Sequence, residues 1–211
     1  MRLRPVLPFA LCGLVLPGAP AAAGELGIEA HGGYFAMSAS NSARAVFDGS
    51  SGGGTFGGGA RYVFGPGIFV AAGARTFSKT GERVFVANAT SPVQKLGFPL
   101  EIRITPIFGT VGYRFFQGRK LVPYLGVGGG VTRFRETSDV AGDAREDSRS
   151  KGTFHALVGV EFGAGSFRVG AEGSWATASD AVGVGGVSRV FNEDDLGGFS
   201  VVGKLVFSFE L

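Results

Sequence analysis

The stretch LVGVEFGAGSFRVGAEGSW, residues 157–175, contains two runs of alternating apolar and polar residues around a short glycine-rich segment. One face of the two runs is apolar and comprises Val158, Val160, Phe162, Phe167, Val169, Ala171 and Trp175. The other face holds Glu161, Arg168 and Glu172 among small residues. A period of two is that of a β-strand, and glycine favours a tight turn. The stretch therefore predicts an antiparallel hairpin with one apolar face.

The same alternation recurs along the chain after residue 26 and predicts eight strands. The strands cover residues 26–37, 55–65, 67–78, 98–116, 121–136, 152–163, 166–177 and 198–211. The connections are alternately long and short: the long ones are 38–54, 79–97, 137–151 and 178–197, and the short ones are Gly65–Gly67, Gln117–Lys120 and Gly163–Gly165. This order predicts an all-β fold, an eight-stranded antiparallel up-and-down barrel.

The polar face changes parity within the fourth predicted strand. Glu101 and Arg103 share one parity, whereas beyond Pro106 the polar residues have the opposite one. One inserted residue would produce this change, and proline is tolerated at bulges because it cannot donate to the ladder. We expect a β-bulge near Pro106; two separate strands kinked there are the alternative.

Aromatic residues gather near both ends of the predicted strands. Those beside the short turns are Phe64, Phe69, Phe115, Phe116, Tyr124, Phe162 and Phe167. Those beside the long loops are Tyr34 or Phe35, Phe56, Phe77, Phe98, Phe134, Phe154, Trp175 and Phe199. In several strands the two rings are separated by about 20–25 Å along a tilted barrel, the height of an outer-membrane apolar band. We therefore expect the apolar face to point outward into lipid, because aromatic rings prefer the headgroup boundary. The alternative interpretation is that these aromatic residues only mark the ends of strands, as they do in any β protein.

The opposite face would then line the lumen. Its predicted polar network comprises Glu29, His31, Arg61, Arg75, Glu101, Arg103, Arg114, His155, Glu161, Arg168, Glu172, Lys204 and Glu210. Basic and acidic residues are nearly balanced in this set, so paired ions are expected to fill a lumen that is only wide enough for side chains. The glycines of YLGVGGGVTRF, residues 124–134, would make room for them.

The first residues predict a signal peptide. Arg2 and Arg4 precede an apolar run at residues 6–16, and small residues follow it, so cleavage is expected near Ala23. The domains are then a signal peptide, 1–23, and a barrel, 24–211. A retained membrane anchor is the alternative. The single cysteine, Cys12, lies in this segment and directly follows Leu11, which disfavours lipid attachment.

The mature chain has little net charge. Removal of two arginines leaves 18 basic and 17 acidic residues, so the net charge is +1 and the basic pI does not indicate nucleic acid as a partner. It has no cysteine for disulfides or thiol chemistry. No apolar run of 18 or more residues follows the signal segment, which excludes a helical membrane protein.

These features resemble the eight-stranded outer-membrane barrels of Gram-negative bacteria, of the OmpA, OmpX and OmpW type, and the broader group of outer membrane protein β-barrel domains. The resemblance covers the mature chain and is carried by VPYLGVGGGVTRF, by the opening hairpin and by the final strand GKLVFSFEL. It implies the cell outer membrane, contact with its lipids and lipopolysaccharide, insertion by the barrel-assembly machinery, and no cofactor. The chain ends in Leu211, whereas this family usually ends in Phe or Trp.

The expected role is structural or surface-interaction, with a lumen filled by side chains. A small OmpW-like channel for apolar or very small solutes is the alternative, and a lipid-modifying enzyme is a third possibility. Some barrels of this size are deacylases with a histidine–serine pair near the C-terminus, which this chain lacks, so no enzyme is expected. Two histidines, His31 and His155, are too few for a metal site. No peptidoglycan-binding domain is expected after Leu211.

The long loops are rich in charge. Segment 137–151 carries Asp139, Asp143, Arg145, Glu146, Asp147, Arg149 and Lys151, and the last loop carries Glu193, Asp194 and Asp195. We expect most of these to be solvated. The sharper hypothesis is that four basic residues at the outer rim contact lipopolysaccharide phosphates: Arg133, Arg135, Arg149 and Lys151.

Overall fold

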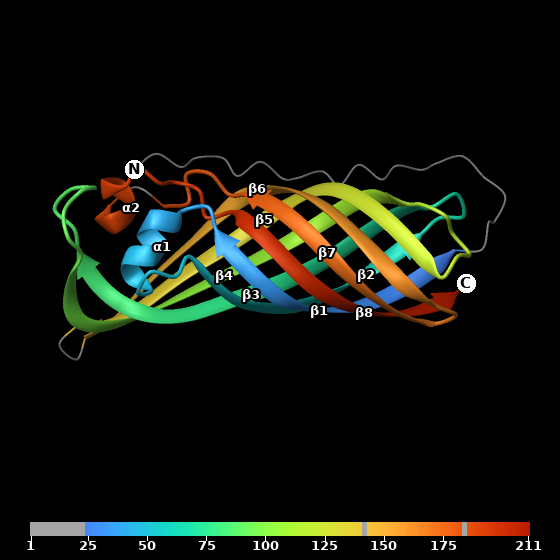
Figure 1. Ribbon diagram of the computed structural model, residues 1–211, viewed down its shortest axis with the longest axis horizontal. Helices are drawn as coiled ribbons and strands as arrows, with labels where there is room; N and C mark the ends of the chain where they lie inside the picture. Colours follow the sequence, from blue (N-terminus) through green and yellow to red (C-terminus); the bar gives the residue numbers. More distant parts are fainter. Residues whose placement is uncertain (1–23, 141–142, 183–184) are drawn as a thin grey trace, which may run out of the picture.

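The computed structural model describes residues 24–140, 143–182 and 185–211, and the predicted signal peptide, 1–23, lies outside this part. Eight strands and two short helices follow one another along the chain (Figure 1). The strands are β1 (Glu25–Met37), β2 (Gly52–Val63), β3 (Ile68–Phe85), β4 (Gln94–Arg114), β5 (Leu121–Val140), β6 (Asp143–Ala164), β7 (Phe167–Thr177) and β8 (Gly198–Glu210). The helices are α1 (Ser40–Val46) and α2 (Gly186–Val190).

The eight strands close into a barrel. Each strand pairs antiparallel with its neighbours in sequence, and β1 pairs with β8 from Glu25 opposite Glu210 to Met37 opposite Gly198. This confirms the eight-stranded up-and-down barrel. Tight turns lie at one end, here called the turn end, and α1, α2 and the long connections lie at the other, the loop end (Figure 1). None of the described helices is long and apolar enough to cross a membrane.

Two of the predicted long loops are largely strand. Residues 79–97 and 137–151 were expected to be loops, but they extend the β3–β4 and β5–β6 hairpins. Pairing of β2 with β3 ends at Phe77, and pairing of β6 with β7 ends at Phe154, so the four strands β3–β6 continue beyond the closed ring as a protruding sheet (Figure 1). Both faces of this sheet lie outside the apolar band. The apolar alternation that revealed the other strands is therefore absent here.

The outer face of the closed ring is an apolar band with an aromatic ring at each end. Exposed aromatic side chains near the loop end are Tyr34, Phe56, Phe154, Trp175 and Phe199, and those near the turn end include Phe64, Tyr113, Phe116, Phe162 and Phe167. Aliphatic side chains such as Ile28, Val111 and Leu205 are exposed between them. This confirms that the apolar face points outward, toward lipid.

Four of the aromatic residues predicted for the outer surface point into the barrel instead. Phe69, Phe77, Tyr124 and Phe134 are buried inside the barrel because they have the inward parity of their strands. For the first strand, where Tyr34 and Phe35 were both candidates, Tyr34 is the exposed one.

The predicted β-bulge near Pro106 is wrong. The ladder between β4 and β5 pairs residues 100–114 with 124–138 without a break, and Pro106 lies within it. Glu101 and Arg103 consequently point away from the lumen, with side chains 42% and 51% exposed. The polar residues of β4 change faces because the strand passes from lipid into water there, so its outer face becomes the polar one.

The inside of the loop end is apolar. A cluster of buried side chains from β1, β3, β4, β5, α1 and the segment before β8 fills it: Phe35, Met37, Ala43, Phe47, Phe77, Ile104, Phe134, Ala178, Ala181 and Leu196. This part of the protein thus packs like a water-soluble domain, with apolar residues inside and polar ones outside. The polarity is the reverse of that in the apolar band.

Glycines on the inner face leave space for long side chains. A Cβ at Gly159 would overlap Cζ and the hydroxyl oxygen of Tyr124. We predict that Gly159→Val displaces this ring and destabilises the barrel by about 1–3 kcal/mol. Urea unfolding in lipid vesicles, followed by the heat-dependent gel mobility of the closed barrel, measures the change. The matched control is Gly173→Val on the outer face, where the nearest atom is Phe199 Cζ at 3.8 Å. Equal unfolding midpoints for the two variants would contradict the prediction.

Candidate functional site

Two arginines share one buried carboxylate in the half of the lumen nearest the turn end. Arg61 of β2 and Arg114 of β4 both donate to Oε2 of Glu161 on β6, at 2.9 and 3.1 Å, and Arg61 makes a second bond to the other oxygen. All three side chains are 1% exposed or less. Arg114 also donates to Glu25 Oε2 at 3.1 Å. Strands from opposite sides of the barrel are thereby joined across its axis.

A second ionic group lies nearer the middle of the lumen. Its centre is Glu172 on β7, which accepts hydrogen bonds from Arg75, from the Tyr124 hydroxyl at 3.0 Å and from Lys204 Nζ at 3.2 Å. Lys204 Nζ also lies 2.9 Å from Glu29 Oε2, and Glu29 Oε1 lies 3.1 Å from Arg61 Nη1. Lys204 and Glu29 therefore connect the two groups.

The two groups together form what we call the ionic plug: Glu25, Glu29, Arg61, Arg75, Arg114, Glu161, Glu172 and Lys204. Its four cations and four carboxylates balance, as buried charges must. The free space beside its members Glu29, Arg61, Arg75, Glu172 and Lys204 is about 20 Å³. That is room for about one water molecule. The charged side chains therefore fill the lumen at this level.

The structure divides the predicted lumen network. Those buried inside are Glu29, His31, Arg61, Arg75, Arg114, His155, Glu161, Glu172 and Lys204. Arg168 is partly buried at the turn end, 3.8 Å from Glu25, and Glu210 is exposed there. Glu101 and Arg103 lie outside, as described above. Sequence reasoning missed Glu25, which precedes the first predicted strand, although its parity matches that of Glu29.

The two histidines are spread along the lumen and bond to different partners. His31 Nε2 lies 3.1 Å from Glu29 Oε2, and His155 Nε2 lies 2.9 Å from Thr110 Oγ1. In the described part of the chain, no three histidine, cysteine or acidic side chains are grouped so that they could hold a metal ion.

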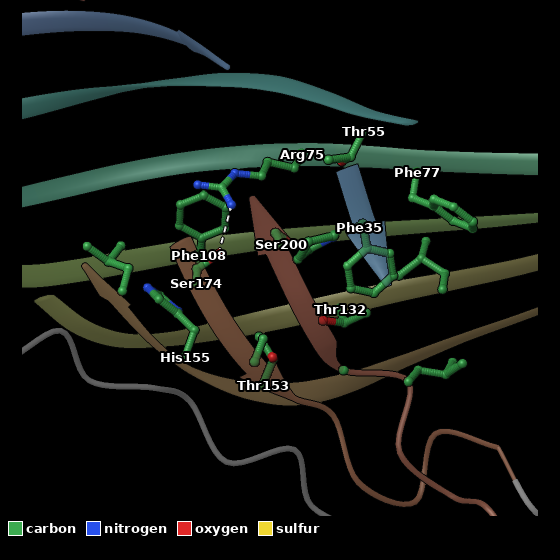
Figure 2. A pocket seen from close by; sticks show the side chains of 16 residues that line it. Phe35, Thr55, Arg75, Phe77, Phe108, Thr132, Thr153, His155, Ser174 and Ser200 are labelled. Carbon is green, nitrogen blue, oxygen red and sulfur yellow. Dashed lines mark hydrogen bonds between the residues drawn. The ribbon is translucent and has the colours of Figure 1, made fainter. Parts of the chain in front are cut away.

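On the loop-end side of the ionic plug, a small cavity of about 60 Å³ lies between the polar and the apolar parts of the lumen (Figure 2). Arg75, which donates to Ser174 Oγ at 3.1 Å, and His155 bound it on the plug side. Phe35 and Phe77 bound it toward the loop end (Figure 2). The polar plug and the apolar cluster thus meet at this level.

The outer rim carries an arginine pair. On the outward face of the protruding sheet, Arg103 of β4 lies directly opposite Arg135 of β5, and Arg133 follows on the same face. Like charges that face each other across strands repel. Each of the two paired arginines has an acidic neighbour: Arg103 Nη2 lies 2.9 Å from Glu101 Oε1, and Arg135 Nε lies 3.2 Å from Glu146 Oε1.

The other two predicted rim residues do not share this face. Arg149 and Lys151 have the parity of Thr153 and His155, which point inward, so they belong to the concave side of the sheet. Arg149 pairs with Asp147 at 2.8 Å. The side chain of Asp143 lies outside the described part of the protein.

Two acidic residues of the last loop accept hydrogen bonds within the protein. Glu193 accepts hydrogen bonds from the backbone N–H groups of Asn41 and Ser42, at 2.9 and 2.8 Å, and from the Ser42 hydroxyl. Asp195 accepts from the N–H groups of Ala178 and Gly197 at 2.6 and 2.7 Å. Both side chains are partly exposed, so they have structural partners in addition to the expected contact with water. Glu193 thereby ties the described end of the last loop to α1, and Asp195 ties it to the end of β7.

The family described as "Outer membrane protein beta-barrel domain" matches residues 9–200. The chain belongs to this family. This confirms the resemblance inferred from the sequence, and it places the protein in the outer membrane, among that membrane's lipids and lipopolysaccharide. No curated protein matches the chain significantly.

Solved outer-membrane structures share the fold of this β-barrel domain. Neisserial surface protein A is 16% identical, with a TM-score of 0.51, and the match covers 90% of this chain and 98% of that one. Ail, the attachment invasion locus protein of Yersinia pestis, is 13% identical, with a TM-score of 0.51 and coverage of 89% and 99%. A major outer membrane protein from Thermus thermophilus is 10% identical, with a TM-score of 0.60 and coverage of 88% and 99%. At these identities the likeness extends to the fold alone.

The outer-membrane barrel should depend on its plug for stability. We predict that Glu161→Gln destabilises the protein by about 3–5 kcal/mol, because two buried arginines then lose their shared counter-charge. The urea midpoint in lipid vesicles measures this loss. Glu101→Gln is the control, since this carboxylate is 42% exposed outside the lumen, and it should change stability by less than about 1 kcal/mol. A Glu161→Gln barrel as stable as the control would mean that the plug is not a stabilising element.

Proposed function

We propose that the protein is a non-conducting, non-catalytic surface barrel that acts through its protruding sheet and outer rim. One observation carries this proposal: balanced, buried ion pairs close the lumen, while four strands extend beyond the apolar band. In this proposal residues 1–23 are removed on export, and the loop end faces the outside of the cell. The barrel-assembly machinery inserts residues 24–211.

The protruding sheet is suited to contact with other surfaces. Segment 143–153 of β6 pairs only with β5 among the described strands, so its other edge is open. It is rich in charged side chains of both signs, which protect an open edge from pairing with copies of itself. Such an edge still leaves backbone donors and acceptors available to a partner strand.

The rim arginines support contact with anionic lipid headgroups. Arg103, Arg133 and Arg135 point outward just beyond the apolar band, at the height where the phosphates of lipopolysaccharide would lie. A phosphate between Arg103 and Arg135 would relieve their mutual repulsion and accept bidentate hydrogen bonds. The revised set replaces Arg149 and Lys151 with Arg103, because those two residues lie on the concave side.

Histidine placement supports the absence of a hydrolase. His31 and His155 are both buried in the lumen, away from the membrane-facing surface where a lipid substrate would lie. A channel is not favoured either, because the cavity below the apolar cluster ends at the plug.

The closed lumen predicts that the purified barrel gives no single-channel current steps in planar bilayers. The physical reason is that the buried charges in the middle of the lumen leave space for about one water. Reproducible steps from the folded, heat-shifted protein would instead support the channel hypothesis.

The rim arginines are expected to hold lipopolysaccharide on the barrel during purification. We expect the triple variant Arg103→Gln/Arg133→Gln/Arg135→Gln to retain at least about tenfold less lipopolysaccharide on purification, since each arginine near an anionic lipid surface contributes about 1 kcal/mol. Phosphate per mole of barrel measures this. Arg149→Gln/Lys151→Gln on the concave side is the matched control and should behave as the unmodified protein. Equal losses in both variants would show that charge alone, and not this face, determines retention.

A further inference from the structure

A larger cavity lies inside the loop end, separate from the plug and the rim. Its volume is about 290 Å³, and it lies between α1, α2 and the concave side of β3–β5. Its wall is mostly apolar and includes Met37, Phe47, Leu100, Ile102, Phe134 and Leu196. Typical small-molecule sites occupy about 300–1,000 Å³, so this cavity suits one small or slender molecule.

The apolar part of the wall makes water a poor occupant of the inner end of the cavity. Interiors are normally close-packed, and an empty void forfeits the contacts that its lining atoms would otherwise make. Cavities lined by aliphatic and aromatic groups stay dry and bind apolar molecules instead. The outer face of the sheet around this cavity carries exposed polar side chains such as Glu101 and Arg103, so the cavity lies beyond the apolar band.

The cover of the cavity is held in place by specific bonds. Glu193 ties the described end of the last loop to the start of α1, as described above. Lys79 of β3 donates to Ser50 Oγ and to the Gly52 carbonyl, both at 2.6 Å, and its Nζ lies 5.0 Å from the centre of the Phe47 ring. Both ends of the first loop are therefore fastened to neighbouring parts of the protein, and α1 between them lines the cavity.

One cation on the wall is only loosely paired. Arg83 of β3 and Glu136 of β5 both line the cavity and form an ion pair, but Arg83 Nη2 lies 3.6 Å from Glu136 Oε1, which is too far for a hydrogen bond, so the guanidinium keeps free donors. Its side chain is 36% exposed, so it can reach both the cavity and water. A carboxylate at the mouth of the cavity could accept its free donors.

The cavity does not lead through the barrel. Below it lie the packed apolar cluster and then the ionic plug, which an alkyl chain could enter only by breaking buried ion pairs. An occupant must therefore enter and leave at the loop end. The volume also excludes lipids with several acyl chains.

We propose that this cavity is a binding site for a single-chain fatty acid taken up from the aqueous side of the loop end. Its alkyl chain lies against the apolar wall and its carboxylate contacts Arg83. This site goes beyond the surface role proposed above and does not depend on it.

The test measures saturable binding of radiolabelled dodecanoic acid to the full mature barrel in lipid nanodiscs, with empty nanodiscs as background. We expect one site per barrel. Ala43→Phe should abolish it, because Ala43 is buried on the wall and the larger ring fills the space. Ala39→Phe, also on the wall, is the second filling variant, and heat-dependent gel mobility verifies that each one folds.

The carboxylate contact is tested separately. Arg83→Gln should weaken dodecanoate binding about fivefold, as expected for a partly exposed charge contact, and leave binding of dodecanol unchanged. Arg103→Gln, on the outer side of the same sheet, is the control and should change neither. The proposal is overturned by an absence of saturable binding or by full binding in folded filling variants. Equal weakening of acid and alcohol by Arg83→Gln, or equal effects of Arg83→Gln and Arg103→Gln, overturns the role of Arg83.

Discussion

Hydrocarbon offers no hydrogen bonds, and this constraint underlies the whole architecture. Every backbone N–H and C=O in the apolar band must find a partner within the protein, which a closed ring of strands provides. Pairing of β1 with β8 completes the ring. Closure with eight strands leaves an interior only wide enough for side chains, so the inward residues must satisfy one another. The sharing of Glu161 by Arg61 and Arg114 within the ionic plug is one result.

The barrel meets two solvents along its length, and its polarity reverses between them. Within the band, apolar side chains point outward and charges point inward. Beyond it, the strands β3–β6 stand in water, so Glu101 and Arg103 point outward while Phe77 and Ile104 pack inside. Strand β4 crosses the boundary without a change of register. A change of surroundings can therefore mimic a β-bulge in the sequence pattern, because both exchange the polar and apolar parities.

This reversal organises the interior into layers. The ionic plug occupies the half nearest the turn end, the apolar cluster lies above it, and a larger cavity lies beneath the helices and the last loop. The polarity of each layer is opposite to that of its surroundings. Charged side chains pair with one another inside the part that faces lipid, and apolar side chains pack inside the part that faces water. Glu193 and Asp195 complete the top layer by fixing the loop that covers it.

The sequence by itself determined the strand order, the closed barrel, the outward apolar face and most of the charged lumen. Alternation with a period of two is a local signal, and a residue such as Glu161 or Arg61 keeps its parity wherever the strand lies. Only the tertiary structure decided which charges pair, since the partners of Glu161 lie on β2 and β4, far away in sequence. It also decided the length of the protruding strands, the inward position of Phe77 and the covered cavity. These depend on where water replaces lipid and on contacts between distant segments, which no local pattern encodes.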